Sequence, residues 1–154
     1  FYGKYFDVVI CNDSGLYFEE LDFEDWRQPG LNIRTPMNMD RLSDEEMIDY
    51  YSKLITGLGG KVTAYYLDGI AVYNQGVISS FMDNMAAQKN GSFYMIDKAS
   101  SKRFEGWPLD SLSINKENGK YFVDGSIEES KENIIKDQYE KSVVDFLIKS
   151  LHIA

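Results

Sequence analysis

The sequence predicts an α+β protein in which an antiparallel sheet with two β-hairpins packs against about three helices, including a long C-terminal amphipathic helix. Two observations favour this class. Strand-like and helix-like segments do not alternate one for one, and two pairs of strand-like segments are joined by short turns. A chain of 154 residues can bury one hydrophobic core, and neither a linker nor a repeat divides it. We therefore expect a single globular domain over residues 1–154.

The N-terminal part of the chain predicts a strand followed by irregular structure. Residues Tyr5–Cys11 are β-branched and aromatic, as is typical of a strand, and the turn-forming residues 12–15 that follow predict its end. The short apolar segments 16–18 and 21–23 are compatible with further strands of the sheet. Pro29 and Pro36 indicate a loop over residues 27–42, because proline removes a backbone hydrogen-bond donor.

The middle of the chain predicts a helix, a hairpin and a second helix. Ser43 and Glu46 have the spacing of a capping box, and the apolar residues that follow recur at helical spacing, which predicts a helix over Asp44–Thr56. Asp68-Gly69 is a favoured hairpin dipeptide, so residues 61–67 and 70–73 are expected to pair. Asn74 is placed as the N-cap of a second helix that ends near residue 90.

The C-terminal part predicts a strand, a hairpin and the long helix. The strand covers residues 92–97, and the hairpin joins residues 112–115 to 120–123 through a loop that ends in glycine. Ser126 and Glu129 form a second capping-box pattern before a helix over Ile127–Leu151. Its apolar residues recur every three or four positions and are expected to pack on the sheet: Ile135, Tyr139, Val143, Phe146, Leu147 and Leu151.

Composition excludes or disfavours several classes of function. The chain has 25 acidic and 16 basic residues, a net charge of −9, so a phosphate-binding nucleic-acid surface is disfavoured. One Cys and one His cannot form the usual zinc tetrahedron. No apolar segment is long enough to span a membrane. The lone Cys11 within an apolar strand favours a reducing compartment, so we expect a cytoplasmic protein.

The sequence contains no recognisable catalytic constellation. His152 near the C-terminus suits the dipole of the preceding helix, and acidic neighbours make Cys11 a poor nucleophile. The glycines of residues 57–60 precede a lysine but are followed by a predicted strand, the reverse of a phosphate-binding loop. We therefore expect no catalytic residue, no cofactor and no metal ligand. Binding of calcium or magnesium by oxygen ligands stays open.

The most unusual segment is Tyr17–Trp26, in which five acids within seven residues alternate with aromatic and aliphatic side chains. One interpretation is a half-buried edge strand that places its acids in water. The other uses the uneven charge of the chain, since residues 1–77 carry 13 acids and only 6 bases. Negative potential beside exposed aromatic rings favours docking of a basic protein. The expected partner-binding residues are Glu19, Glu20, Asp22, Glu24, Asp25 and Trp26.

On this acidic, Tyr- and Trp-rich α+β plan and on the segment YFEELDFEDW, the chain resembles bacterial immunity proteins of contact-dependent inhibition and related polymorphic toxin systems. The resemblance implies a non-enzymatic, cytoplasmic toxin inhibitor that neutralises a basic cognate toxin domain, for example a nuclease, by protein–protein contact. The residues themselves support only an acidic protein-binding surface. A regulatory or structural interaction module is the alternative function, and a carboxylate-dependent enzyme is a third.

Overall fold

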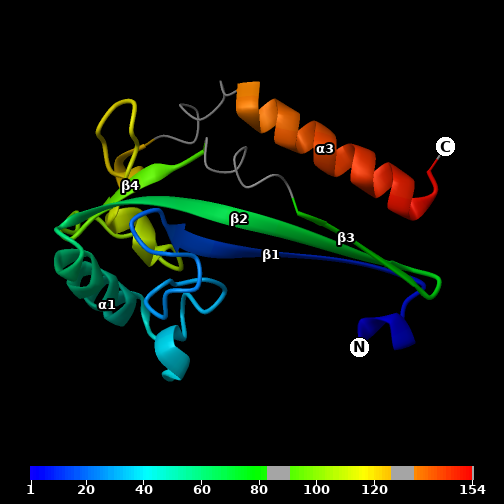
Figure 1. Cartoon of the computed structure of the whole chain (residues 1–154), viewed down its shortest axis with the longest axis horizontal. Coiled ribbons are helices and arrows are strands. Elements are labelled where there is room, and N and C mark those ends of the chain that lie inside the picture. The colour runs from blue at the N-terminus through cyan, green and yellow to red at the C-terminus, as the bar shows by residue number, and fades with distance from the viewer. Residues whose placement is uncertain (83–90, 126–133, 154) are drawn as a thin grey trace. The chain divides into compact units, whose positions relative to one another are not determined.

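The computed structural model describes residues 1–82, 91–125 and 134–153. Its five strands form one sheet in the order β1-β2-β4-β5, with β3 also paired to β2. The strands are β1 (Val8–Phe18), β2 (Lys61–Asn74), β3 (Val77–Met82), β4 (Phe93–Ile96) and β5 (Ser113–Ile114). Antiparallel pairing joins β2 to β3 and β4, and β4 to β5 (Figure 1).

Two α-helices lie in the described part of the chain, α1 (Asp44–Gly57) and α3 (Ile134–Leu151). The predicted α+β class with an antiparallel sheet is therefore confirmed, whereas the prediction of about three helices is not. Neither helix has the length and apolar content that a membrane crossing requires.

The chain divides into two compact units. The core unit comprises Gly15–Tyr66 and Ser92–Lys131, and the terminal unit comprises Phe1–Ser14, Leu67–Gly91 and Glu132–Ala154. Strands β1 and β2 each contribute residues to both units. A single domain over residues 1–154 stays a prediction.

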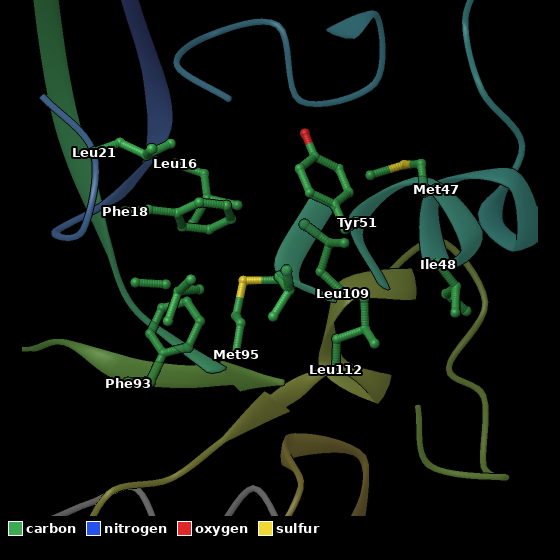
Figure 2. Packing of buried hydrophobic residues seen from close by; sticks show 13 residues of the cluster. Leu16, Phe18, Leu21, Met47, Ile48, Tyr51, Phe93, Met95, Leu109 and Leu112 are labelled. Carbon is green, nitrogen blue, oxygen red and sulfur yellow. The ribbon is translucent and has the colours of Figure 1, made fainter. Parts of the chain in front are cut away.

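The hydrophobic core lies within the core unit. Side chains from β1, α1, β2, β4 and the short 3-10 helix η3 (Pro108–Ser111) converge there, as Figure 2 shows. The buried cluster consists of Leu16, Phe18, Leu21, Met47, Ile48, Tyr51, Ile55, Val62, Ala64, Phe93, Met95, Leu109 and Leu112. The hydroxyl of the buried Tyr51 donates a hydrogen bond to the carbonyl oxygen of Ile33 at 2.9 Å, which also ties the 27–42 loop to α1.

Helix α1 confirms its prediction to within one residue. The Ser43 hydroxyl accepts a hydrogen bond from the Glu46 backbone N–H, and the Glu46 carboxylate accepts one from the Ser43 N–H at 2.8 Å. This capping box satisfies two backbone donors that the first helical turn leaves without partners. At the other end, the Gly60 N–H donates to the Ile55 carbonyl at 2.9 Å with Gly60 at φ 86°, a backbone conformation that suits glycine.

The predicted turns at residues 12–15 and 68–69 are both wrong. Strand β1 begins at Val8 and continues through residues 12–15 to Phe18, and β2 continues through Asp68 and Gly69. Gly69 pairs with Met82 of β3 instead of turning the chain. Pairing with neighbouring strands supplies partners for the backbone N–H and C=O groups, and this outweighs the local turn preference.

The hairpin is present seven residues further along the chain, at Gln75 and Gly76. Gln75 and Gly76 have φ values of 45° and 93°, so both central residues of the turn between β2 and β3 are left-handed, as a tight hairpin favours. The predicted second helix is therefore wrong over residues 77–82, which form β3. Its remaining part, residues 83–90, lies outside the described residues.

The C-terminal predictions are confirmed in part. The strand expected over residues 92–97 is β4. The second hairpin is reduced to the two-residue β5 and one isolated bridge between Ile114 and Tyr121, after which the chain forms a short 3-10 helix over Phe122–Asp124. The long C-terminal helix is α3, described from Ile134, so the predicted start at Ile127 and the second capping box lie outside the described residues.

Candidate functional site

Polar side chains lie in the middle of two neighbouring strands of the sheet. Asp13 and Ser14 belong to β1, and Asp68 belongs to β2. These are the positions where local propensity favoured turns, because Asn, Asp, Ser and Gly are poor strand formers. The tertiary structure holds them in extended backbone instead, which brings two carboxylates of the terminal unit to adjacent strands.

A hydrogen-bond chain links the two strands at this point. The Ser14 hydroxyl donates to Oδ1 of Asp68, across 54 residues of sequence. Oδ1 of Asp13 accepts a hydrogen bond from the Ser14 backbone N–H at 2.9 Å. Ser14 therefore contacts both carboxylates, and its hydroxyl fixes the orientation of Asp68 relative to β1. We call Asp13, Ser14 and Asp68 the strand carboxylate site.

The residues of the strand carboxylate site differ in their exposure to solvent. Asp13 is exposed, whereas Ser14 and Asp68 are half-buried. Gly69 follows Asp68 and lies close to β1, because a Cβ added there would stand 4.0 Å from the Asp13 carbonyl oxygen. The site thus consists of two carboxylates and one hydroxyl on paired strands, connected through the hydrogen bonds of Ser14.

The donor set of the strand carboxylate site consists of oxygen atoms, which are the ligands of hard cations such as Mg²⁺ and Ca²⁺. Its oxygen ligands are those that Mg²⁺ prefers, and Mg²⁺ is typically held by one or two carboxylates together with substrate phosphates. In the described ranges no group of three or more His, Cys, Asp or Glu side chains is placed to hold a metal ion.

The sequence-predicted partner-binding residues lie in a different place, in the loop that follows β1. Residues 19–26 form consecutive turns, so the edge-strand interpretation of this segment is wrong. The Gln28 side chain stabilises the loop, since it accepts from the Phe18 N–H and donates to the Phe18 carbonyl, both at 2.8 Å. Leu21 is buried in the core, but Phe23 is exposed and stacks on Tyr17 at 4.9 Å between ring centroids.

The acids of this loop differ in their contacts. Glu20 accepts hydrogen bonds from the Thr63 N–H at 2.7 and 2.9 Å, so its carboxylate continues the backbone pairing of β2. Asp25 forms a salt bridge with Arg27 at 2.6 Å, and the Arg27 hydrogen bonds lower the pKa of Asp25 to about 2. Glu19, Asp22 and Glu24 are exposed, and the negative charge of Glu24 adds to burial in raising the pKa of Tyr17.

Trp26 is exposed at the end of the same loop and lines a pocket with residues of α1. Trp26 therefore lines a pocket, whereas Glu20 is hydrogen-bonded to the backbone of β2. That these six residues bind a protein stays a prediction.

A second fixed loop lies at the start of α1. Asp44 accepts hydrogen bonds from the Gly106 N–H at 2.7 Å and from Arg34 at 2.9 Å, and the Gly106 contact is the larger cause of its lowered pKa. Arg103 binds Glu45 at 2.7 Å. These contacts hold residues 103–107 against the helix, while Phe104 and Trp107 remain exposed.

Sequence reasoning missed the strand carboxylate site because both of its segments were interpreted as turns. One signal was present in the sequence. Residues 12–15 and 68–69 are each flanked on both sides by β-branched and aromatic residues, so a polar interruption within a long strand fits the pattern as well as a turn does. The choice between them depends on pairing between segments far apart in the chain, which one sequence does not show.

Comparison with known proteins gives a match in structure alone. No family model matches the chain, and no curated protein matches it in sequence. Among solved structures, the chain has the fold of Ham1 proteins.

Three of these structures show the extent of the likeness. The Ham1 protein of Staphylococcus aureus matches with a TM-score of 0.62 and 20% identity, over 94% of this chain and 69% of that one. The HAM1 protein of Coxiella burnetii matches with a TM-score of 0.60 and 14% identity, over 92% of this chain and 68% of that one. The nucleoside-triphosphatase / dITP/XTP pyrophosphatase of Mycobacterium abscessus matches with a TM-score of 0.58 and 12% identity, over 91% of this chain and 66% of that one.

This likeness corrects the sequence-based interpretation. The resemblance to immunity proteins is wrong, because the fold is that of Ham1 proteins, and one solved example of it is a nucleotide-hydrolysing enzyme. The expectations that followed from the resemblance, a non-enzymatic inhibitor and a basic toxin partner, are wrong with it. The acidic and aromatic composition that suggested them is compatible with many α+β proteins and identifies none.

Proposed function

We propose that this chain hydrolyses a nucleoside triphosphate to the monophosphate and pyrophosphate, with the strand carboxylate site at the reacting phosphates. The observation that carries the proposal is the linked pair of carboxylates, Asp13 and Asp68, in the middle of the sheet of a chain with this fold. The dITP/XTP pyrophosphatase of Mycobacterium abscessus supports the reaction class.

The reaction needs a nucleophile, a base and relief of charge repulsion. Water attacks the α-phosphorus, the bond from that phosphorus to the bridging oxygen breaks, and pyrophosphate leaves with the bond electrons. Asp13 is the exposed carboxylate of the site and accepts the proton that the attacking water loses. Asp68 would hold Mg²⁺, and the metal would supply neutralisation of the phosphate charge.

Ser14 acts as a positioning residue in this scheme. Its hydroxyl hydrogen bond keeps Asp68 at a fixed distance from β1, and its backbone N–H orients Asp13. Because both contacts come from one residue of a paired strand, the two carboxylates keep their relative geometry without a flexible loop. Such preorganisation avoids an entropic cost when the substrate binds.

The test is release of pyrophosphate from dITP, XTP and ATP in the presence of MgCl₂. We expect turnover by the wild-type chain and, for Asp13→Asn, a loss of about 100-fold or more, as is typical when a general base is removed. Asp68→Asn should lower the rate and raise the Mg²⁺ concentration needed for half-maximal activity. Ser14→Ala should give a smaller loss that Ser14→Thr partly restores.

Asp7→Asn is the matched control, since Asp7 is an exposed carboxylate of the same unit, one residue before β1. It should retain the wild-type rate. Melting temperatures of all variants must stay close to that of the wild type. No release of pyrophosphate from any of the triphosphates, or a wild-type rate for Asp13→Asn, would contradict the proposal.

A further inference from the structure

A pocket of about 530 Å³ lies in the core unit and shares no residue with the strand carboxylate site. One wall comes from Trp26 and Arg27, a second from residues 37–42, and the third from the solvent-facing side of α1. Its lining residues are Trp26, Arg27, Met37, Met39, Leu42, Glu46, Asp49, Tyr50, Lys53 and Leu54. Its volume lies in the range of pockets that bind small organic molecules.

The walls of this pocket expose large apolar side chains. Trp26 is 71% exposed, Met37 57% and Met39 40%, so three large apolar side chains gather around one concavity. The Tyr50 ring packs edge-on against the buried Tyr51 at 5.1 Å between ring centroids, which fixes its position. An indole ring and two polarizable thioethers around one concavity are well suited to the face of an aromatic ligand.

The backbone of one wall is strained. Met37 has φ 55° and ψ 31°, and Asn38 has φ 60°, so two consecutive non-glycine residues adopt the left-handed conformation. The conformation is unfavourable for methionine, and glycine would adopt it without that penalty. Strained backbone conformations of this kind are often found at ligand-binding sites, so they support a functional role for the pocket.

The charged residues of the pocket are engaged with one another or with the backbone. Arg27 binds Asp25 through two nitrogens at 2.6 and 3.0 Å, and Lys53 binds Asp49 at 2.6 Å. Glu46 accepts hydrogen bonds from Ser43 in the capping box. The two cations are therefore neutralised by acids, which disfavours an anionic ligand, while Glu46 and Asp49 can accept hydrogen bonds from N–H groups.

We propose that this pocket binds a planar, uncharged nitrogen heterocycle. The ring packs against the Trp26 indole and the thioethers of Met37 and Met39, and its N–H groups face the carboxylates of Glu46 and Asp49. This ligand class follows from three features together: the aromatic and thioether walls, the salt-bridged cations, and the hydrogen-bond acceptors Glu46 and Asp49. The site is independent of the proposed triphosphate hydrolysis.

The experiment uses adenine as the probe, because it is planar and uncharged at neutral pH and carries N–H donors. The chain has two tryptophans, Trp26 and Trp107, so Trp107→Phe leaves Trp26 as the single fluorescent reporter. Trp107 is exposed and lies outside the pocket lining. We expect saturable quenching of Trp26 emission by adenine and weaker quenching by AMP, whose phosphate carries negative charge.

Calorimetric titration of the otherwise wild-type chain locates the site. Trp26→Ala and Met39→Ala should each weaken adenine binding by tenfold or more, whereas Met82→Ala, an exposed methionine of the terminal unit, should leave it unchanged. Met37→Gly should weaken binding while leaving the melting temperature equal or higher, because glycine adopts the left-handed backbone readily. Weaker binding together with an unchanged or higher melting temperature shows that the Met37 side chain contacts the ligand and does not merely stabilise the fold.

Three results would overturn the proposal: no saturable quenching up to millimolar adenine, the same affinity in Trp26→Ala as in the wild type, or tighter binding of AMP than of adenine. Adenine binding that persists in Asp13→Asn shows that the pocket does not depend on the strand carboxylate site. Failure of one proposal therefore leaves the other unaffected.

Discussion

The core unit and the terminal unit differ in how much of their apolar surface is buried. All 13 residues of the buried cluster belong to the core unit. In the described part of the terminal unit, Leu67 and Val72 are the buried large hydrophobic residues, and many others are exposed: Phe1, Tyr2, Tyr5, Phe6, Val8, Ile10, Val77, Ile78, Met82, Val144, Ile148 and Ile153. Burial of apolar surface is the main source of folding free energy, so stability is concentrated in the core unit.

The two helices show the same difference. Helix α1 buries Met47, Ile48, Tyr51 and Ile55, while in α3 the side chains described from residue 140 onward are half-buried or exposed. Both helices have apolar residues at helical spacing, and the sequence predicted both. Periodicity therefore indicates that a helix forms and which face is apolar, but it does not indicate how completely that face is covered.

The largest expected effect is loss of the Phe18 side chain, which is fully buried in the core unit. Phe18→Ala removes a packed ring from a close-packed interior and should lower the free energy of unfolding by about 3–5 kcal/mol. Urea denaturation measures it. Phe104→Ala is the matched control in the same unit, because Phe104 is largely exposed, and it should change stability by less than about 0.5 kcal/mol.

A smaller effect is expected for Phe146 in α3. The sequence predicted a core residue, but Phe146 is half-buried and stacks on Phe81 at 5.4 Å between ring centroids. Phe146→Ala should therefore cost about 1–2 kcal/mol, the scale of one aromatic pair with partial burial. Urea denaturation of Phe146→Ala under the same conditions measures its loss of stability for comparison with that of Phe18→Ala. Equal losses for the two variants would mean that the two units are equally well packed.

The third effect depends on pH. Burial raises the pKa of Tyr51 above its ordinary value of 10.0, because the folded state disfavours the tyrosinate. Below pH 10 both states keep the proton, so the stability contribution is complete; above pH 10 the unfolded state ionises first and stability falls. The loss is about 1.4 kcal/mol per pH unit until the folded-state pKa is reached.

The measurement for Tyr51 compares wild type with Tyr51→Phe in urea between pH 9 and 11. The wild type should lose more stability than the variant over this interval, since phenylalanine cannot ionise. At pH 7 the variant tests a different property, the hydrogen bond to the Ile33 carbonyl. Parallel curves for both proteins would show that Tyr51 is not buried in solution.

The smallest effect is loss of the cap of α1. Ser43→Ala removes the side chain that accepts from the Glu46 N–H and should cost about 1 kcal/mol. Ser43→Asp, which keeps an acceptor at the N-cap, should retain most of the stability. Thermal melting of the three proteins measures the difference. An unchanged melting temperature in Ser43→Ala would mean that core packing alone determines where α1 begins.

The sequence predicted the candidate sites less well than the fold. It singled out Trp26, which lines the pocket of the core unit, but assigned it to a protein interface. It placed Asp13, Ser14 and Asp68 in turns, so their function was not considered. The reason is physical: a site made of residues from separate strands exists only after the strands pair, and local propensities do not encode that pairing.

By itself the sequence determined the features that depend on near neighbours in the chain. The boundaries of α1 follow from a capping box and from glycines in left-handed conformations, and the α3 pattern is local in the same sense. Tertiary structure alone decided that β1 and β2 continue through Asp13 and Asp68, and that Met37 adopts a left-handed backbone. In the strands, hydrogen bonds between distant segments outweigh a turn preference of less than about 1 kcal/mol per residue, so Asp13 and Asp68 lie in extended backbone where local chemistry favoured turns.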